Sequence, residues 1–156
     1  MKINIDLIVV GSLKEKAMKM LSDEYLKRLQ AYSKVKVIEL KDESNGLDEK
    51  IVLEREANKI KNAIDESSFI IVMDINQDQI SSEQLADKMQ NIASYNASKI
   101  TFIIGGSLGL HQDIKDMANY KLSFSKMTFP HQLFRIMLLE QIYRAFRINN
   151  NAPYHK

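Results

Sequence analysis

The sequence predicts an α/β fold in which a mainly parallel sheet is flanked by helices. Two observations carry this prediction: strand-like and helix-like stretches alternate along the 156 residues, and residues 69–73 form an uninterrupted apolar run. Alternation of this kind is typical of parallel sheets, because each parallel strand needs a crossover connection. A strand that is apolar on both sides is expected where helices cover both faces of the sheet.

Five stretches have the composition of β-strands. They are residues 3–10, which Gly11 closes, residues 35–40, 69–75 and 100–104, and a short fifth strand at residues 121–124. In parallel sheets, ligands bind outside the edge formed by the carboxyl ends of the strands. Three segments at the carboxyl ends of predicted strands are therefore candidate parts of a ligand site: residues 73–77, 105–110 and 124–129.

Two capping motifs predict where helices begin. Ser12 and Glu15 have the spacing of a capping box, and they predict a helix that runs to about Ala31. Ser81 and Gln84 have the same spacing and predict the start of a later helix.

The remaining helices are marked by apolar periodicity and by proline. A polar turn at residues 45–46 precedes a helix with apolar residues at helical spacing between positions 51 and 64. The last helix is predicted over residues 131–148, directly after Pro130. Pro153 excludes helix from the tail.

Length and composition predict a cytoplasmic protein of one domain that spans residues 1–156. Domains commonly have about 100–200 residues. The chain has no cysteine, which excludes disulfides, thiolate nucleophiles and cysteine-ligated zinc. Its longest apolar run is far shorter than the ~20 residues of a membrane helix, so no membrane association is expected. The histidines at positions 111, 131 and 155 lack metal-ligand spacing, so no metal is expected either.

Positive charge is concentrated at the C-terminal end. The whole chain has a formal net charge of +2, from 22 Lys and Arg against 20 Asp and Glu. Residues 121–156 contain six of these bases and one acid, a net charge of +5, which leaves 16 bases and 19 acids, a net charge of −3, in residues 1–120. Such a split favours a polyanionic partner, although a solvated basic helix without a partner has the same composition.

The segment GGSLG at residues 105–109 has several interpretations. It is not a phosphate-binding loop, since no Gly-Lys-Ser/Thr follows, and its spacing differs from that of a dinucleotide fingerprint. It matches the nucleophile elbow of serine hydrolases at Ser107, with Asp113 or Asp116 and then His131 as partners, but an oxyanion motif and a larger sheet are lacking. The other interpretations are close approach of the backbone to a flat ligand and a tight turn without a ligand.

Residues 123–130 form a loop before the last helix. The loop offers backbone donors and acceptors, small hydroxyls and apolar side chains, but no cradle for phosphate. This mixture suits an adenosine-like ligand. The alternative is a capped entry to the helix, in which Phe124 and Phe129 belong to the core.

The last helix has an apolar stripe and a charged side. At ~100° per residue, Glu140, Arg144 and Arg147 lie together, away from the stripe. They predict either a solvated, salt-bridged face or an arginine surface that contacts RNA phosphates. In the second case the aromatic rings at positions 143, 154 and 155 are available to stack on an unpaired base.

Four C-terminal blocks, in their order, resemble one known family. They are residues 102–110 (FIIGGSLGL), 122–131 (LSFSKMTFPH), 140–145 (EQIYRA) and 153–156 (PYHK). They resemble the bacterial ribosomal RNA large subunit methyltransferase H family of the SPOUT class, whose members methylate N3 of a pseudouridine in a 23S rRNA stem-loop. The likeness spans the whole chain, and the N-terminal half adds support without being specific.

The resemblance implies a C-terminal trefoil knot, a homodimer, S-adenosyl-L-methionine as cofactor, and 23S rRNA or the assembled ribosome as partner. Carried over position by position, the family's cofactor contacts fall on Met73, Gly105, Phe124, Ser125, Lys126, Met127, Thr128 and Phe129. Met73 stands where many relatives have leucine, and Leu108 where others have a polar residue.

The implied reaction needs positioning and a route for one proton. Methyl transfer from a sulfonium is an in-line displacement, and the imino proton at N3 of pseudouridine must leave. The candidate catalytic residues are His155, Glu140, Arg144 and Tyr154, the last as a stacking platform. RNA contacts are expected from Arg144, Arg147, Tyr154, His155 and Lys156. The family's dimeric site implies that the tail of one subunit completes the pocket of the other.

Two functions of other classes are alternatives. A non-catalytic ribosome-binding module would keep the basic helix but would not need the loops at Gly105 and residues 124–129. A serine hydrolase would use Ser107 as its nucleophile.

Overall fold

The computed structural model describes residues 1–43 and 46–155, in which strands and helices alternate. In chain order the elements are β1 (Asn4–Val10), α1 (Lys16–Leu29), β2 (Val35–Leu40), α2 (Glu49–Ala63), β3 (Phe69–Gln79), α3 (Ser82–Tyr95), β4 (Lys99–Ile104), α4 (Gln112–Met117), β5 (Tyr120–Ser123) and α5 (His131–Asn149). The predicted turn at residues 45–46 lies partly outside the described residues, since only Gly46 is described.

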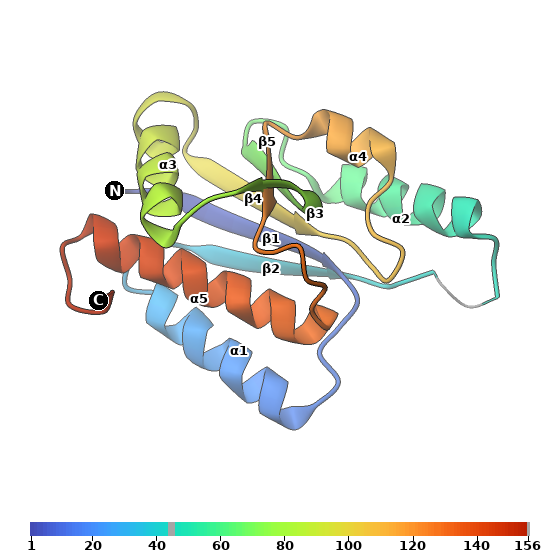
Figure 1. Cartoon of the computed structure of the whole chain (residues 1–156), viewed down its shortest axis with the longest axis horizontal. Helices are drawn as coiled ribbons and strands as arrows, with labels where there is room; N and C mark the ends of the chain where they lie inside the picture. The colour runs from blue at the N-terminus through green and yellow to red at the C-terminus, as the bar shows by residue number, and fades with distance from the viewer. Residues whose placement is uncertain (44–45, 156) are drawn as a thin grey trace.

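The strands form one parallel sheet in the order β2-β1-β4-β3-β5. Helices α1, α3 and α5 pack on one face, and α2 and α4 on the other (Figure 1). Alternate side chains of β1 serve the two faces: Leu7 is buried with α1, α3 and α5, whereas Ile8 is buried with α2 and α4. The predicted α/β class, with a parallel sheet flanked by helices, is confirmed.

Strand β3 is longer than the predicted residues 69–75, and its pairing is interrupted. Pairing with β5 reaches Met73, shifts, and resumes at Asp78, so that Leu122 is the partner of both residues. Pairing can resume at the polar residues Asp78 and Gln79 because it uses backbone groups, which every non-proline residue carries. The interruption places residues 74–77 at the carboxyl edge of the sheet. Strand order does not decide how the C-terminal segment is threaded, so the trefoil knot stays a prediction.

The two predicted capping boxes have different outcomes. At Ser81 the box is formed: the Gln84 backbone N–H donates to Ser81 Oγ at 3.1 Å, and the Ser81 N–H donates to Gln84 Oε1 at 2.8 Å. At Ser12 the prediction is wrong, because α1 begins at Lys16, three residues later than predicted, with Glu15 as an N-cap that makes no side-chain capping bond.

Contacts with α5 explain the late start of α1. The Lys14 backbone N–H donates to Gln132 Oε1 at 3.0 Å, and Arg135 donates to the Gly11 carbonyl at 3.1 Å. These bonds hold the segment between β1 and α1 against α5 in a non-helical conformation. The opposite end of the chain agrees closely with expectation, since α5 extends one residue beyond the predicted 131–148. Among the described residues, none of the helices combines the length and the hydrophobicity needed to cross a bilayer.

Candidate functional site

A cavity of about 440 Å³ opens at the carboxyl edge of β3, β4 and β5. It is lined by residues from all three segments that the sequence singled out, together with Ile104, Lys115, Leu122, Ser123, His131 and Phe134. The volume lies within the ~300–1,000 Å³ that is usual for small-molecule sites. The position agrees with the general rule for open parallel sheets.

Most residues to which the resemblance assigns cofactor contacts lie around this cavity. Those that line it are Met73, Gly105, Phe124, Ser125, Met127, Thr128 and Phe129. Lys126 does not line it, and its side chain is exposed. The cavity also includes Asp74, which lies in the predicted segment 73–77 but was not assigned a role, and Lys115, which lies outside all three predicted segments. Asp74 directly follows the apolar run at residues 69–73, so a carboxylate at this strand end could have been singled out from the sequence. Lys115 lies on the short helix α4, for which no bounds were predicted.

The glycine segment folds into a tight turn that packs on itself. The Gly109 N–H donates to the Gly106 carbonyl at 3.0 Å, and Gly109 has φ +81°. A Cβ on Gly105 would lie 2.5 Å from the Gly109 carbonyl oxygen. Glycine at position 105 is therefore required by the turn itself, before any ligand is considered.

The loop that follows β5 is tied both to β3 and to α5. Ser123 Oγ lies 3.0 Å from the carbonyl oxygens of Ile75 and Ser125, which joins the interruption in β3 to this loop. The rings of Phe124 and Phe129 pack against Phe134 of α5, with centroids 5.1 and 6.4 Å away. Both aromatic residues line the cavity as well. The two interpretations of this loop, helix entry and ligand wall, are thus compatible.

A serine hydrolase triad is not assembled in the described part of the chain. Ser107 is exposed, and no hydrogen bond joins it to His131. Asp113 is instead paired with Lys61, whose Nζ lies 3.1 Å from its Oδ2. The nucleophile-elbow interpretation of the glycine segment therefore has no structural support.

The charged side of α5 and the C-terminal tail form one network. Arg144 donates to Glu140 Oε1 from Nε at 2.9 Å and from Nη2 at 2.6 Å, and Tyr154 donates to the same oxygen at 3.2 Å. Arg144 also lies over the Tyr154 ring, 4.8 Å from its centroid. The side chains of Glu140 and Arg144 are 17% and 25% exposed, so this face is packed rather than freely solvated.

His155 closes the network through both ring nitrogens. Arg144 Nη1 lies 3.0 Å from His155 Nδ1, and Nε2 lies 2.6 Å from Glu83 Oε1. Arginine only donates, so Nδ1 accepts, and the ring proton of the neutral form is on Nε2. This bond from His155 lowers the pKa of Glu83.

Burial and hydrogen bonds also shift the pKa of Tyr154 and of the two arginines on the charged side of α5. Burial, followed by the charge of Glu140, raises the pKa of Tyr154 to about 12, so its hydroxyl stays protonated at neutral pH. The hydrogen bond to Glu140 raises the pKa of Arg144. Arg147 donates to Tyr32 Oη at 2.7 Å, and this bond raises the pKa of Arg147.

The C-terminal network and the cavity are separate within one chain. None of the network's described residues lines the cavity, and Lys156 lies outside the described residues. In the part of the chain that is described, no three His, Asp or Glu side chains are grouped so that they could hold a metal ion.

Comparison with known proteins identifies the family. The model of a family described as "Predicted SPOUT methyltransferase" matches residues 1–155. This chain belongs to the SPOUT methyltransferase family. The parallel sheet and the loops at its carboxyl edge are thus those of a SPOUT enzyme, and the class inferred from the C-terminal motifs is confirmed.

Individual relatives support the same assignment. A protein of Clostridium botulinum (strain Alaska E43) named "Ribosomal RNA large subunit methyltransferase H" is 51% identical over 158 residues, covering 98% of this chain and 99% of that protein. A probable methylase family protein from Haemophilus influenzae has a similar fold, with a TM-score of 0.60 and 15% identity over 100% of this chain and 72% of its own. A putative methyltransferase from Legionella pneumophila, solved with bound SAM, has a TM-score of 0.51 and 11% identity, over 92% of this SPOUT chain and 66% of its own.

Proposed function

We propose that this SPOUT methyltransferase transfers a methyl group from S-adenosylmethionine to N3 of a pseudouridine in 23S ribosomal RNA. One observation carries the proposal: the cavity at the carboxyl edge is built from the three loops that the resemblance assigns to the cofactor. The Clostridium botulinum relative, whose name includes ribosomal RNA, supports the substrate class. The structural neighbour from Legionella pneumophila supports the cofactor. An rRNA substrate would also agree with a cytoplasmic location.

The chemistry of the cavity fits a nucleoside that carries no phosphate. Its walls are apolar at Met73, Ile104 and Phe124, and hydroxyls are available from Ser125 and Thr128. No arginine lines the cavity among the described residues, so the bidentate phosphate recognition typical of arginine is lacking. The apolar walls would exclude water, and the turn at residues 105–109 would present backbone groups to the base. When bound, S-adenosylmethionine supplies an electrophilic methyl group on a sulfonium.

The charged groups that act on the pseudouridine would come from the C-terminal network. The guanidinium of Arg144 would stabilise the anion that forms at N3. Glu140 is a poor proton acceptor, because Arg144, Tyr154 and Gln141 already donate to its two oxygens. We therefore favour His155 as the base, once its contacts with Arg144 and Glu83 open. Tyr154, which keeps its proton, would serve as a stacking platform, and Arg147 and Lys156 would add phosphate contacts.

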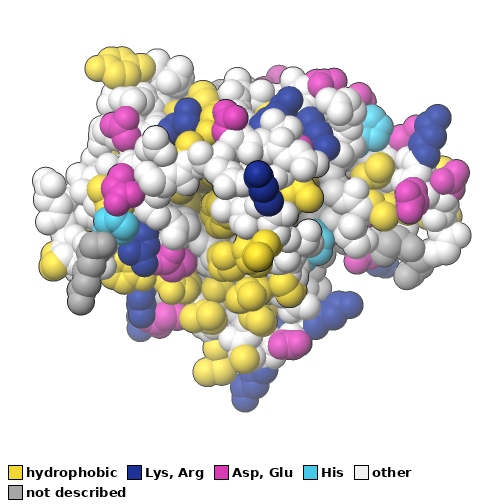
Figure 2. All heavy atoms as spheres, in the orientation of Figure 1, with side chains coloured by type: hydrophobic (Ala, Val, Ile, Leu, Met, Phe, Trp, Pro, Cys, Tyr) yellow, Lys and Arg dark blue, Asp and Glu magenta, His cyan; other side chains and the backbone are white. Residues whose placement is uncertain are grey.

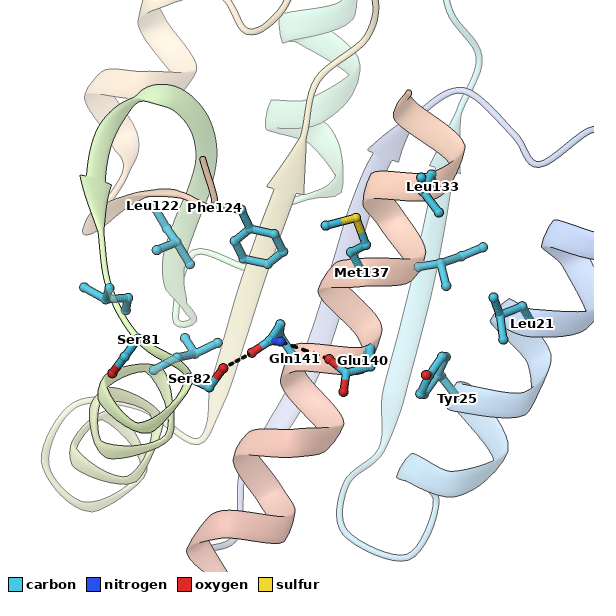
Figure 3. Close-up of a pocket in the computed structure, with 13 residues that line it drawn as sticks. Leu21, Tyr25, Ser81, Ser82, Leu122, Phe124, Leu133, Met137, Glu140 and Gln141 are labelled. Carbon is cyan, nitrogen blue, oxygen red and sulfur yellow. Dashed lines mark hydrogen bonds between the residues drawn. The ribbon is translucent and has the colours of Figure 1, made fainter. Parts of the chain in front are cut away.

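A homodimer would bring the two halves of the site together. None of the network's described residues lines its own chain's cavity, so we propose that the tail of one subunit completes the cavity of the other. A largely apolar groove of about 500 Å³ between α1, α3 and α5 offers the surface for pairing, with Leu21, Tyr25, Leu133 and Met137 among its lining (Figure 3). Glu140 of the network lines the same groove. Figure 2 shows hydrophobic side chains gathered over α1 and α5 on this face. Leu21 is 42% exposed here.

Mass spectrometry of rRNA tests the reaction directly. Ribosomal RNA from cells with the gene is expected to contain a methylated pseudouridine that is missing when the gene is deleted and that returns with the wild-type gene. The purified protein, given labelled cofactor and either free 23S rRNA or assembled ribosomes, would show which of the two it methylates. Binding to ribosomes without any methyl transfer would instead support the non-catalytic module.

A further inference from the structure

Two opposite charges face the cavity at its strand-end wall. Asp74 follows Met73 where the pairing of β3 with β5 breaks, and Lys115 lies on α4. They are the only carboxylate and the only ammonium group among the described residues that line the cavity. Lys115 Nζ lies 3.4 Å from Asp74 Oδ2, so the two charges are neighbours.

The contacts of this pair leave hydrogen-bonding capacity unused. Besides Lys115, the Asp74 carboxylate accepts from Gln77 Nε2 at 3.3 Å and from the Asn76 N–H at 3.5 Å. Charge-assisted hydrogen bonds are usually about 2.7–2.9 Å long, so all three contacts with described residues are long. The Asp74 side chain is 12% exposed and that of Lys115 is 28% exposed. A mostly buried carboxylate held this loosely is suited to a further cationic partner.

We propose that Asp74 and Lys115 bind the amino-acid end of the cofactor, Asp74 receiving the α-ammonium group and Lys115 the α-carboxylate. This inference rests on the proposed function, because it takes S-adenosylmethionine as the ligand. An α-amino acid carries one positive and one negative charge on the same carbon, which matches two neighbouring protein charges of opposite sign. The four charges would alternate around a ring, so the Asp74–Lys115 pair would be kept while two charge-assisted bonds are added.

Two other roles for the pair make different predictions. A purely structural ion pair would hold α4 against β3 and would be indifferent to the ligand's amino-acid end. An Asp74 that faces the sulfonium would distinguish a charged sulfonium from a neutral thioether. Three ligands separate these roles: S-adenosylmethionine, S-adenosylhomocysteine, which lacks the methyl group and the charge on sulfur, and methylthioadenosine, which lacks the amino-acid end.

The experiment measures the affinity of all three ligands by calorimetry for the wild type, Asp74→Asn and Lys115→Met. Loss of either charge should weaken S-adenosylmethionine and S-adenosylhomocysteine alike by about tenfold or more. Methylthioadenosine should bind all forms with the same affinity, which also shows that the cavity of each variant is intact. Asp113→Asn is the matched control, because it removes an α4 ion pair that lies outside the cavity. It should leave all three affinities unchanged.

The possible failures are distinguishable. If the wild type binds neither S-adenosylmethionine nor S-adenosylhomocysteine, the proposed function itself is wrong. If the wild type binds both and the two variants keep these affinities, the pair is structural and only the inference fails. A loss confined to S-adenosylmethionine would assign Asp74 to the sulfonium, and an equal loss for methylthioadenosine would indicate a distorted cavity. Either result would overturn the proposed amino-acid contact.

Discussion

The glycine segment at the cavity depends on backbone packing at single positions. Gly105 and Gly109 face each other across the turn, and no side-chain atom fits at position 105 without moving the Gly109 carbonyl. Gly46 is in a different situation: it has φ +70°, but a Cβ there would meet no atom within 4 Å. Substitutions at Gly105 and at Gly46 therefore separate the effect of a steric clash from the effect of backbone strain.

Gly105→Ala is expected to abolish cofactor binding, because its methyl group would displace the carbonyl that shapes the turn. Gly46→Ala should cost only about 1–2 kcal/mol of unfolding free energy, from its left-handed backbone, and should leave the affinity for S-adenosylhomocysteine unchanged. Calorimetry and urea denaturation of both variants provide the comparison. Normal binding by Gly105→Ala would mean that the turn rearranges without loss.

Asp65 is the residue whose acid titration should be visible in the stability of the protein. Hydrogen bonds from the Ser67 hydroxyl and backbone N–H, and then from Lys99, lower the pKa of Asp65 to about 2. The folded state therefore binds this proton less readily than the unfolded state, in which aspartate has a pKa of about 3.9. The stabilisation is complete above about pH 4 and is lost as the pH falls through about 2.

Asp65→Asn should accordingly be less stable than the wild type at pH 7, and the difference should shrink as the pH falls from about 4 to about 2. Urea unfolding across this range measures the difference. Ser67→Ala removes the largest cause of the shift, so it should move the loss of stability to higher pH. A difference between Asp65→Asn and the wild type that does not change with pH would contradict this account.

Single residues of the candidate site were predictable to different degrees. The resemblance supplied Met73, Gly105 and most of the loop after β5, whereas pattern alone supplied only the strand ends. Lys115 could not be found from the sequence, because a lysine on a six-residue helix has no signature of its own. Its place beside Asp74 results from the crossover that carries α4 from β4 past β3 to β5. That relation is tertiary and leaves no local signal.

At the level of elements, two sequence motifs of the same form behave differently. Ser81 caps α3 with both bonds of a capping box, whereas Ser12 caps nothing, since α1 begins at Lys16. Ser81→Ala should lower the unfolding free energy by about 1 kcal/mol, the usual cost of a lost N-cap. Ser12→Ala should change it by less than about 0.5 kcal/mol. Urea denaturation of the two variants gives the comparison, and equal losses would show that the motif at Ser12 also stabilises the protein.

The bounds of other elements show which parts of the fold could be predicted from the sequence and which could not. Strand β2 and helix α5 were predicted to within one residue, because the composition of β2 and the proline before α5 act locally. The start of α1 was wrong because bonds from Gln132 and Arg135, more than a hundred residues away, hold the chain before it. The interruption of β3 was missed for a similar reason. Its register is set by β5, which no window around residues 74–77 contains.

For the whole molecule, the separation of the cavity from the C-terminal network is the feature with the largest consequence. The network is bonded to its own α5 and to Glu83 of α3. A second subunit that supplies this network would have to dock on an exposed surface, and the groove between α1, α3 and α5 is lined partly by the same helix. Pairing through this groove would therefore couple dimer formation to the position of the tail.

A mixture of two inactive variants tests the shared site. Deletion of residues 154–156 should abolish methylation but leave the affinity for S-adenosylhomocysteine within a few-fold of the wild type, because Tyr154 and His155 do not line the cavity. Gly105→Ala should be inactive for the opposite reason, with an intact tail and a distorted cavity. When the two are refolded together, each mixed dimer would contain one intact cavity opposite one intact tail, so partial activity should return. Native mass spectrometry of differently tagged subunits verifies that mixed dimers have formed. No recovery in verified mixed dimers would mean that each subunit completes its own site, with the tail leaving α5 to reach the cavity of the same chain.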